Sequence, residues 1–142
     1  MTPDLTPPPS FSLDPRLERD SDSLMALSLC DLRLHKDGRW PWLVLVPRHP
    51  GLEEVFDLSP DDQMRLWQEV NRVAKALKQA SGALKINVAA IGNIVRQLHV
   101  HVIARQEGDA NWPGPVWGFG AAEPWNEAAR SRFLTRLTGE LQ

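Results

Sequence analysis

Cysteine and tyrosine are almost absent from the chain: Cys30 is the single cysteine among 142 residues, and there is no tyrosine. One cysteine excludes an internal disulfide and fits a reducing compartment, so we expect the protein in the cytoplasm. No apolar run approaches the roughly 20 residues of a membrane span. The N-terminus also lacks the basic and apolar segments of a secretory signal. We therefore predict no association with a membrane.

An excess of positive charge is also missing. The formal net charge is −2, and no run of lysine or arginine marks a basic groove. Such a chain has no general attraction to nucleic acid, and we expect a small-molecule partner. Hydrophobic residues make up 42% of the sequence, which is ordinary for a folded domain of this length.

Proline is concentrated at the N-terminus, with four residues in Met1–Ser10. This composition predicts an extended arm over residues 1–10, followed by a single domain over residues 11–142. Asp14-Pro15 has the form of a helix start, with an acidic cap and proline at the first helical position.

Alternating and helical patterns then predict the elements of the domain. Residues 27–35 alternate in polarity, with Cys30 among the buried positions, and Asp37-Gly38 predicts a tight hairpin turn. The return strand, residues 40–46, is apolar on both faces and belongs in the middle of a sheet. Ser59-Pro60 begins a long amphipathic helix that ends at Gly82.

A further strand is predicted over residues 85–91 and a C-terminal helix over residues 123–141. The predicted fold class is therefore α+β: an antiparallel sheet of about five strands with one long helix and a C-terminal helix.

The stretch from Arg96 to Arg105 contains the candidate catalytic or ligand-binding side chains. Its polar and apolar residues alternate with a period of two, which places Gln97, His99 and His101 on one face of a strand. Side chains two apart on a strand are roughly 7 Å from each other, since each residue rises about 3.3 Å. Two of the four histidines of the chain are here. Two imidazoles and a carboxamide at this spacing can converge on one phosphate or one metal ion.

Phosphoryl chemistry suits these residue types. An unprotonated imidazole is a nucleophile near neutral pH, and a second ring can contact a phosphate oxygen. The turn at Gly92-Asn93 can bring backbone N–H groups to the same anion, because glycine allows a close approach. The alternative is a metal site on His99 and His101, with Glu107 as a possible third ligand. His35 and His49 lie elsewhere in the sequence without an acidic companion.

The sequence resembles the histidine-triad (HIT) superfamily. The signature of that superfamily is His-φ-His-φ-His-φ-φ, where φ is apolar, and here it reads Gln97-Leu-His99-Val-His101-Val-Ile103. Gly92-Asn93 matches the Gly-Gln that precedes the triad. The resemblance runs from about Leu24 to Gly118. Trp112-Pro-Gly-Pro and Trp40-Pro-Trp42 resemble a bacterial branch that is diadenosine-tetraphosphate-hydrolase-like, with Gln in place of the first triad histidine.

The resemblance implies a hydrolase or nucleotidyl transferase that acts on a nucleotide or dinucleotide and needs no cofactor or metal. His99, the middle position, would attack the α-phosphorus and carry the nucleotidyl group. His101 would contact the phosphate, and Gln97 would stand at the remaining triad position. Asn93 would take the polar role of the family's glutamine. The resemblance also implies a homodimer.

Further binding residues are predicted around these groups. Asn87 shares a face with His99 if strand pairing is regular, and is a candidate ligand contact. Leu29, Leu32 and Trp42 are candidates for the apolar pocket of the base. Trp112 and Trp117 follow the histidine strand and either cover the mouth of the site or form a dimer contact.

Two departures from the family pattern keep another interpretation open. Gln97 cannot titrate or act as an acid, and Pro41-Trp42 stands where many relatives have Gly-His. General acid catalysis contributes about 10²–10⁴ in rate, so its loss leaves only slow turnover. The alternative function is a non-catalytic nucleotide-binding module, and a third is a metal-binding protein.

Overall fold

The computed structural model describes residues 10–142, so the predicted arm lies outside the described residues apart from Ser10. The helices are α1 (Pro15–Asp20), the short 3₁₀ turn η1 (Val55–Asp57), α2 (Pro60–Ser81) and α3 (Glu127–Leu141). The strands are β1 (Ser21–Ala26), β2 (Cys30–His35), β3 (Trp42–Pro47), β4 (Lys85–Ala89) and β5 (Val100–Arg105). Over residues 10–142 no helix is both long and apolar enough to cross a membrane.

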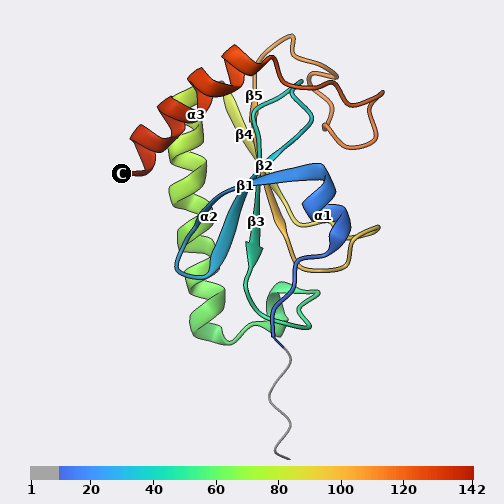
Figure 1. Cartoon of the computed structure of the whole chain (residues 1–142), viewed down its shortest axis with the longest axis vertical. Coiled ribbons are helices and arrows are strands. Elements are labelled where there is room, and N and C mark those ends of the chain that lie inside the picture. The colour runs from blue at the N-terminus through green and yellow to red at the C-terminus, as the bar shows by residue number, and fades with distance from the viewer. Residues whose placement is uncertain (1–9) are drawn as a thin grey trace, which may run out of the picture.

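The five strands form one antiparallel sheet in the order β1-β2-β3-β5-β4 (Figure 1). This confirms the predicted α+β class. β3 lies at the centre, and all six of its residues are buried. Its lack of alternation is explained by this position, because both faces of a central strand are covered here.

The long helix begins and ends as its sequence predicts. The Ser59 hydroxyl accepts a hydrogen bond from the Asp62 N–H at 3.2 Å, and Gly82 ends the helix in the left-handed region with φ +68°. Proline at the first turn and glycine at the end are typical of helix termini. α2 therefore places a continuous apolar stripe against the sheet.

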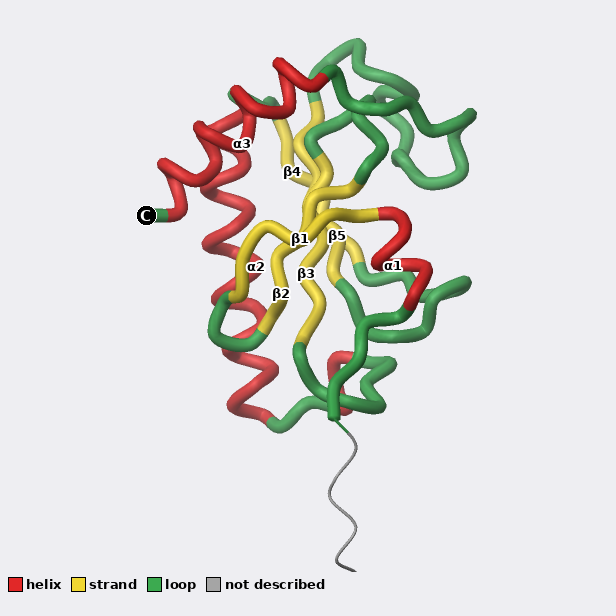
Figure 2. Tube along the Cα trace, in the orientation of Figure 1, coloured by secondary structure: helices red, strands yellow, loops and turns green. Residues whose placement is uncertain are grey.

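The sheet separates two packed layers (Figure 2). α2 and α3 cover one face, and α1 with the loops covers the other. The helix-side core includes Cys30, Leu32 and Leu34, as the alternation in β2 predicts. The opposite layer is formed by Leu17, Trp40, Trp42, Val44, Val46, Ile103 and Val116.

The connection between β2 and β3 differs from the predicted tight turn. The two strands are paired, but Lys36 to Pro41 forms a wider loop. Gly38 is not among the glycines that have a positive φ in residues 10–142. Glycine is needed here for another reason: a Cβ at Gly38 would lie 2.6 Å from the Trp125 Cα. Its N–H donates to the Glu123 carbonyl at 2.6 Å, so this loop is bound to the segment before α3.

The histidine strand is shorter than predicted. β5 begins at Val100, and the residue before His99, Leu98, donates its N–H to the Leu52 carbonyl instead of to a strand. His101 faces Val44 of β3 on one side and Ala89 of β4 on the other. The two histidines thus lie where the chain enters the middle of the sheet.

Candidate active site

A cavity of about 380 Å³ lies over the loop side of the sheet. It is lined by α1, by His35 of β2, by Trp42 and Val44 of β3, by the turn at residues 91–95, by Trp117 and by the two histidines. A larger open depression of about 950 Å³ along α3 contains no histidine, cysteine or aromatic side chain. Three imidazoles, those of His35, His99 and His101, therefore gather in the smaller cavity.

His99 is held in one orientation by the backbone of Gln97. Its side chain is buried, and its Nδ1 lies 2.7 Å from the carbonyl oxygen of Gln97. A carbonyl only accepts, so Nδ1 carries the proton and the neutral ring has its lone pair on Nε2. Burial lowers the pKa of His99, although the Gln97 carbonyl and Asp14 act in the opposite direction. Near neutral pH the ring therefore presents an unprotonated Nε2.

His101 has the opposite tautomer. The indole N–H of Trp42 donates to His101 Nδ1 at 3.0 Å, and an indole can only donate. The proton of the neutral ring is therefore on Nε2. Burial, followed by the neighbouring His99 and His35, lowers the pKa of His101 to about 3. The His99 and His101 ring centres are 4.8 Å apart and meet edge-on, so the ring with a lone pair on Nε2 is next to the ring with an N–H on Nε2.

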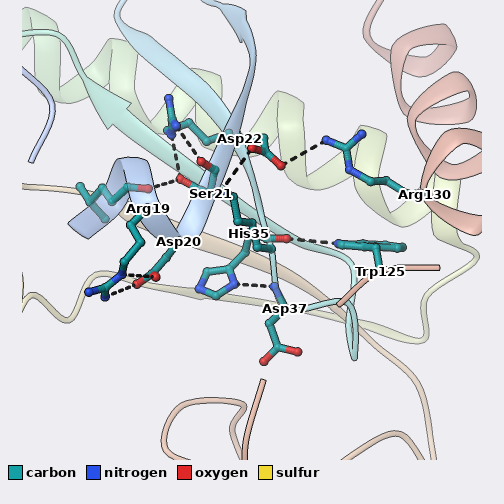
Figure 3. A network of polar contacts seen from close by, with 11 residues as sticks. Arg19, Asp20, Ser21, Asp22, His35, Asp37, Trp125 and Arg130 are labelled. Atoms are coloured by element: carbon teal, nitrogen blue, oxygen red, sulfur yellow. Dashed lines mark hydrogen bonds and ion pairs between the residues drawn. The ribbon is translucent and has the colours of Figure 1, made fainter. Parts of the chain in front are cut away.

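A third imidazole, His35, joins the site although its place in the sequence separates it from the others. Its ring stacks on Trp42 with centroids 3.8 Å apart. Its Nδ1 accepts the Asp37 N–H at 3.0 Å, as Figure 3 shows. Burial lowers the pKa of His35. The polar residues of β2 (Asp31, Arg33 and His35) alternate with the apolar ones, and this pattern indicates that His35 lies on the face opposite the helix-side core. Only the pairing of β2 with β3 brings the ring to the cavity.

The turn before the histidines and one of the two predicted tryptophans also reach the cavity. Gly92, with φ +70°, and Asn93 line it, as does Trp117. Trp117 meets Trp42 and His101 edge-on, at centroid distances of 6.1 and 5.3 Å. Trp112 instead lies beside the Arg105 guanidinium, 5.6 Å from its ring centre, and does not line the cavity.

Asn87 and the two leucines lie elsewhere, contrary to prediction. Asn87 is on the predicted face but is paired with Ile103, and its Oδ1 accepts from Arg105 at 3.2 Å. It is therefore displaced along the strand toward the far end of β5. Leu29 and Leu32 belong to the helix-side core. The alternation of β2 turns Leu32 away from the cavity, and Leu29 precedes that strand.

The third ligand suggested for a metal, Glu107, is exposed and follows the end of β5 at Arg105. In the described part of the chain no group of three or more His, Cys, Asp or Glu side chains could hold a metal ion. Cys30 is fully buried in the helix-side core, where burial raises the pKa of its thiol.

Gln97 lies beside the histidines but turns its side chain toward the N-terminal segment. Its Oε1 accepts from the Asp14 N–H, and its Nε2 donates to the Ser12 carbonyl, both at 2.8 Å. The carboxamide is thus bonded to backbone, and it lies outside the lining of the histidine cavity.

Residues 16–108 match the HIT domain family. The chain belongs to this family. It is 60% identical to a histidine triad protein of Sinorhizobium meliloti, with a TM-score of 0.89 and coverage of 92% of this chain and 97% of that one. A histidine triad protein of Bradyrhizobium japonicum is 41% identical, with a TM-score of 0.92 and coverage of 94% and 100%.

A curated relative is more distant. The AP-4-A phosphorylase of Mycobacterium tuberculosis is 36% identical over 75 residues, which are 49% of this chain and 38% of that protein. The match therefore spans under two fifths of the relative's length.

Proposed function

We propose that this HIT protein is a nucleotide hydrolase or nucleotidyl transferase that acts through a covalent bond between phosphorus and Nε2 of His99. The observation that carries the proposal is the pair of opposite tautomers. His99 offers a buried, unprotonated Nε2, and His101 offers an Nε2–H beside it. A nucleophile and a fixed hydrogen-bond donor at adjacent positions suit attack on a phosphoryl group.

In the proposed reaction, the lone pair of His99 Nε2 forms a bond to the α-phosphorus. The bond from that phosphorus to the leaving group breaks, and the leaving group departs with the electron pair and takes a proton from water. His101 Nε2–H donates to a non-bridging phosphate oxygen. Backbone N–H groups of the Gly92-Asn93 turn are suited to bind the negative charge of the same phosphate. Water then cleaves the P–N bond and releases the mononucleotide.

The substrate class rests on the relatives. One of them is named for AP-4-A, and a dinucleoside polyphosphate or a nucleoside phosphoramidate has the phosphorus that this mechanism requires. The proposal also includes the diadenosine-tetraphosphate-hydrolase-like branch, a homodimeric assembly and a cytoplasmic location, as the resemblance and the single cysteine suggest.

A second candidate is a non-catalytic nucleotide-binding module. Gln97 favours it, because its carboxamide is bonded to backbone and cannot act as an acid. Trp42 favours it too, since an indole stands where many relatives have an ionisable histidine.

The substitution His99→Ala tests both candidates. The protein is mixed with a dinucleoside tetraphosphate labelled at the α-phosphorus and denatured at alkaline pH, where a P–N bond survives. We expect wild type to show a nucleotidyl adduct on the peptide containing His99, and the variant to show none and to release no mononucleotide. The variant still binds AMP, because the rest of the cavity remains.

His49→Ala is the matched control, because His49 is exposed, pairs with Asp62 at 3.3 Å and lies outside the cavity. It should behave as wild type. Turnover by His99→Ala at the wild-type rate would contradict the nucleophile. AMP binding by wild type with neither adduct nor turnover would support the binding module.

A further inference from the structure

We propose that Gln97 is a positioning residue: its carboxamide clamps residues 12–14 and thereby holds α1 as one side of the nucleotide cavity. In this view the residue at the first triad position acts on the ligand through α1 and not by contact with phosphate. The ligand is the nucleotide of the proposed function, on which this inference rests. The Gln97 clamp denotes the two side-chain hydrogen bonds to Ser12 and Asp14.

The clamp uses both polar atoms of one planar group. Oε1 accepts from the Asp14 N–H and Nε2 donates to the Ser12 carbonyl, each at 2.8 Å, across 83 and 85 positions of sequence. A carboxamide carries its donor and acceptor side by side and can bind a peptide backbone at two points. An imidazole has a donor and an acceptor on ring atoms that point apart. Glutamine is therefore suited to this contact in a way that histidine is not.

The clamped segment leads directly into α1. Asp14 is the N-cap of the helix, and its Oδ1 accepts the Arg16 N–H at 2.9 Å. Arg16 Nη1 then donates to the Ile94 carbonyl at 3.1 Å, in the turn that also lines the cavity. Leu17 is buried in the layer that contains Trp42 and Val44.

α1 has only six residues. Isolated helices shorter than about 12–15 residues are marginal in water, so α1 depends on these tertiary contacts for its place. Arg16, Leu17, Arg19 and Asp20 of this helix line the cavity. Loss of the clamp should therefore loosen one side of the cavity while the sheet remains intact.

The backbone of Gln97 has a separate role. Its carbonyl accepts the Nδ1–H of His99 and orients the proposed nucleophile. A side-chain substitution at Gln97 leaves this carbonyl in place. The proposal therefore expects such a variant to lose affinity for the nucleotide more than it loses reactivity of His99.

The first test is Gln97→Ala, studied by hydrogen–deuterium exchange and by binding of AMP. The clamp predicts about tenfold faster exchange in the peptide covering residues 13–21, from the loss of two hydrogen bonds. It also predicts weaker AMP binding, with KM for the dinucleotide raised more than kcat is lowered. Unchanged exchange in this peptide would overturn the proposal.

Gln97→His separates the clamp from a missing catalytic histidine. The clamp predicts that exchange of residues 13–21 is as fast in Gln97→His as in Gln97→Ala, with no gain in turnover. Higher turnover together with wild-type exchange would show that the position acts as a triad member, and would overturn the proposal.

A double-mutant cycle isolates one bond of the clamp. Asp14 has φ −56° and ψ 131°, which proline can adopt. Asp14→Pro removes both the cap carboxylate and the N–H that Gln97 binds, whereas Asp14→Ala removes only the carboxylate. We expect Asp14→Pro to exchange several-fold faster than Asp14→Ala over residues 16–21, and this difference to vanish when Gln97 is alanine.

An equal difference in both backgrounds would overturn the clamp. The outcomes also separate this inference from the proposed function. If wild type fails to bind AMP while the exchange coupling holds, the nucleotide function alone fails. If turnover and AMP binding hold and the coupling is absent, the clamp alone fails.

Discussion

Trp42 contributes to the site through the one hydrogen bond that an indole can donate. Its Nε1–H donates to His101 Nδ1, its ring stacks on His35, and Trp117 meets it edge-on. A histidine at this position could donate or accept and could change its charge. Trp42 can only donate and stays neutral, so the tautomer of His101 is determined by a group that does not titrate.

Trp42→Phe tests this role. Phenylalanine keeps an aromatic ring against His35 but removes the donor, leaving His101 Nδ1 without its partner. The cost of such an unpaired buried group is about 1–3 kcal/mol. We expect kcat of the dinucleotide reaction to fall by about tenfold or more, because His101 no longer holds its Nε2–H toward the phosphate.

The measurement is steady-state kinetics with the fold checked by circular dichroism. Trp67→Phe is the matched control: Trp67 lies on α2 with 43% of its surface exposed. It should leave kcat unchanged. Equal kcat in Trp42→Phe and wild type would show that the tautomer of His101 does not depend on the indole.

At the scale of the element, the loop between β2 and β3 joins the site to the segment before α3. The Asp37 N–H binds His35 Nδ1, and the next residue, Gly38, donates to the Glu123 carbonyl. Trp125 Nε1 donates to the His35 carbonyl at 3.2 Å. Figure 3 shows the hydrogen bonds of His35 with Asp37 and Trp125. The position of the third imidazole thus depends on a backbone approach that only glycine permits.

Gly38→Ala tests that approach. The added Cβ would lie 2.6 and 2.7 Å from the Trp125 Cα and N, which are backbone atoms and cannot turn aside. Overpacking of this kind costs about 1–3 kcal/mol. We expect the free energy of unfolding in urea to fall by that amount.

Gly139→Ala is the control, because a Cβ at this helical position of α3 would meet nothing within 4 Å. It should stabilise the protein by about 0.5–1 kcal/mol through the higher helix propensity of alanine. A Gly38→Ala protein as stable as wild type would mean that the segment at Trp125 moves freely away from the loop.

At the scale of the whole molecule, the sheet separates the main hydrophobic core from the candidate active site. The face under α2 and α3 holds the larger aliphatic core, and the other face carries the aromatic layer and the histidines. Burial lowers the pKa of all three cavity histidines, His35, His99 and His101. The native state therefore binds fewer protons than the unfolded chain as soon as pH falls below the ordinary histidine value.

The global stability should consequently depend on pH in a definite direction. An unfolded histidine takes up its proton near pH 6.5, whereas native His101 does so only near a pKa of about 3. Stability is full above pH 6.5 and is lost as pH falls toward 3. His101 alone should contribute about 1 kcal/mol per pH unit between pH 6 and 4.5.

Urea denaturation from pH 7.5 to 4.5 measures this slope. Depressed carboxyl pKa values, such as that of Asp14 at about 2, affect stability mainly at lower pH. His101→Gln should reduce the slope by the stated amount, and Trp67→Phe, which removes no titratable group from the surface of α2, should leave it unchanged. A slope identical in wild type and His101→Gln would contradict the burial of a neutral ring.

Much of this protein follows from local sequence. The period of two in β2 predicts the burial of Cys30, and the cap residues at Ser59 and Gly82 predict the ends of α2, because these signals act within one element. The His99-Val-His101 pair is also local, and a strand or an extended lead-in places both rings on one face.

Only the tertiary structure decided which residues line the cavity. His35 enters it because β2 pairs with β3, whereas Asn87 lies too far along β4 and Leu32 faces α2. The partners of Gln97 lie 83 and 85 positions away in sequence. Strand order, register and contacts between distant segments arise from packing of the whole chain, and no periodicity within one element encodes them.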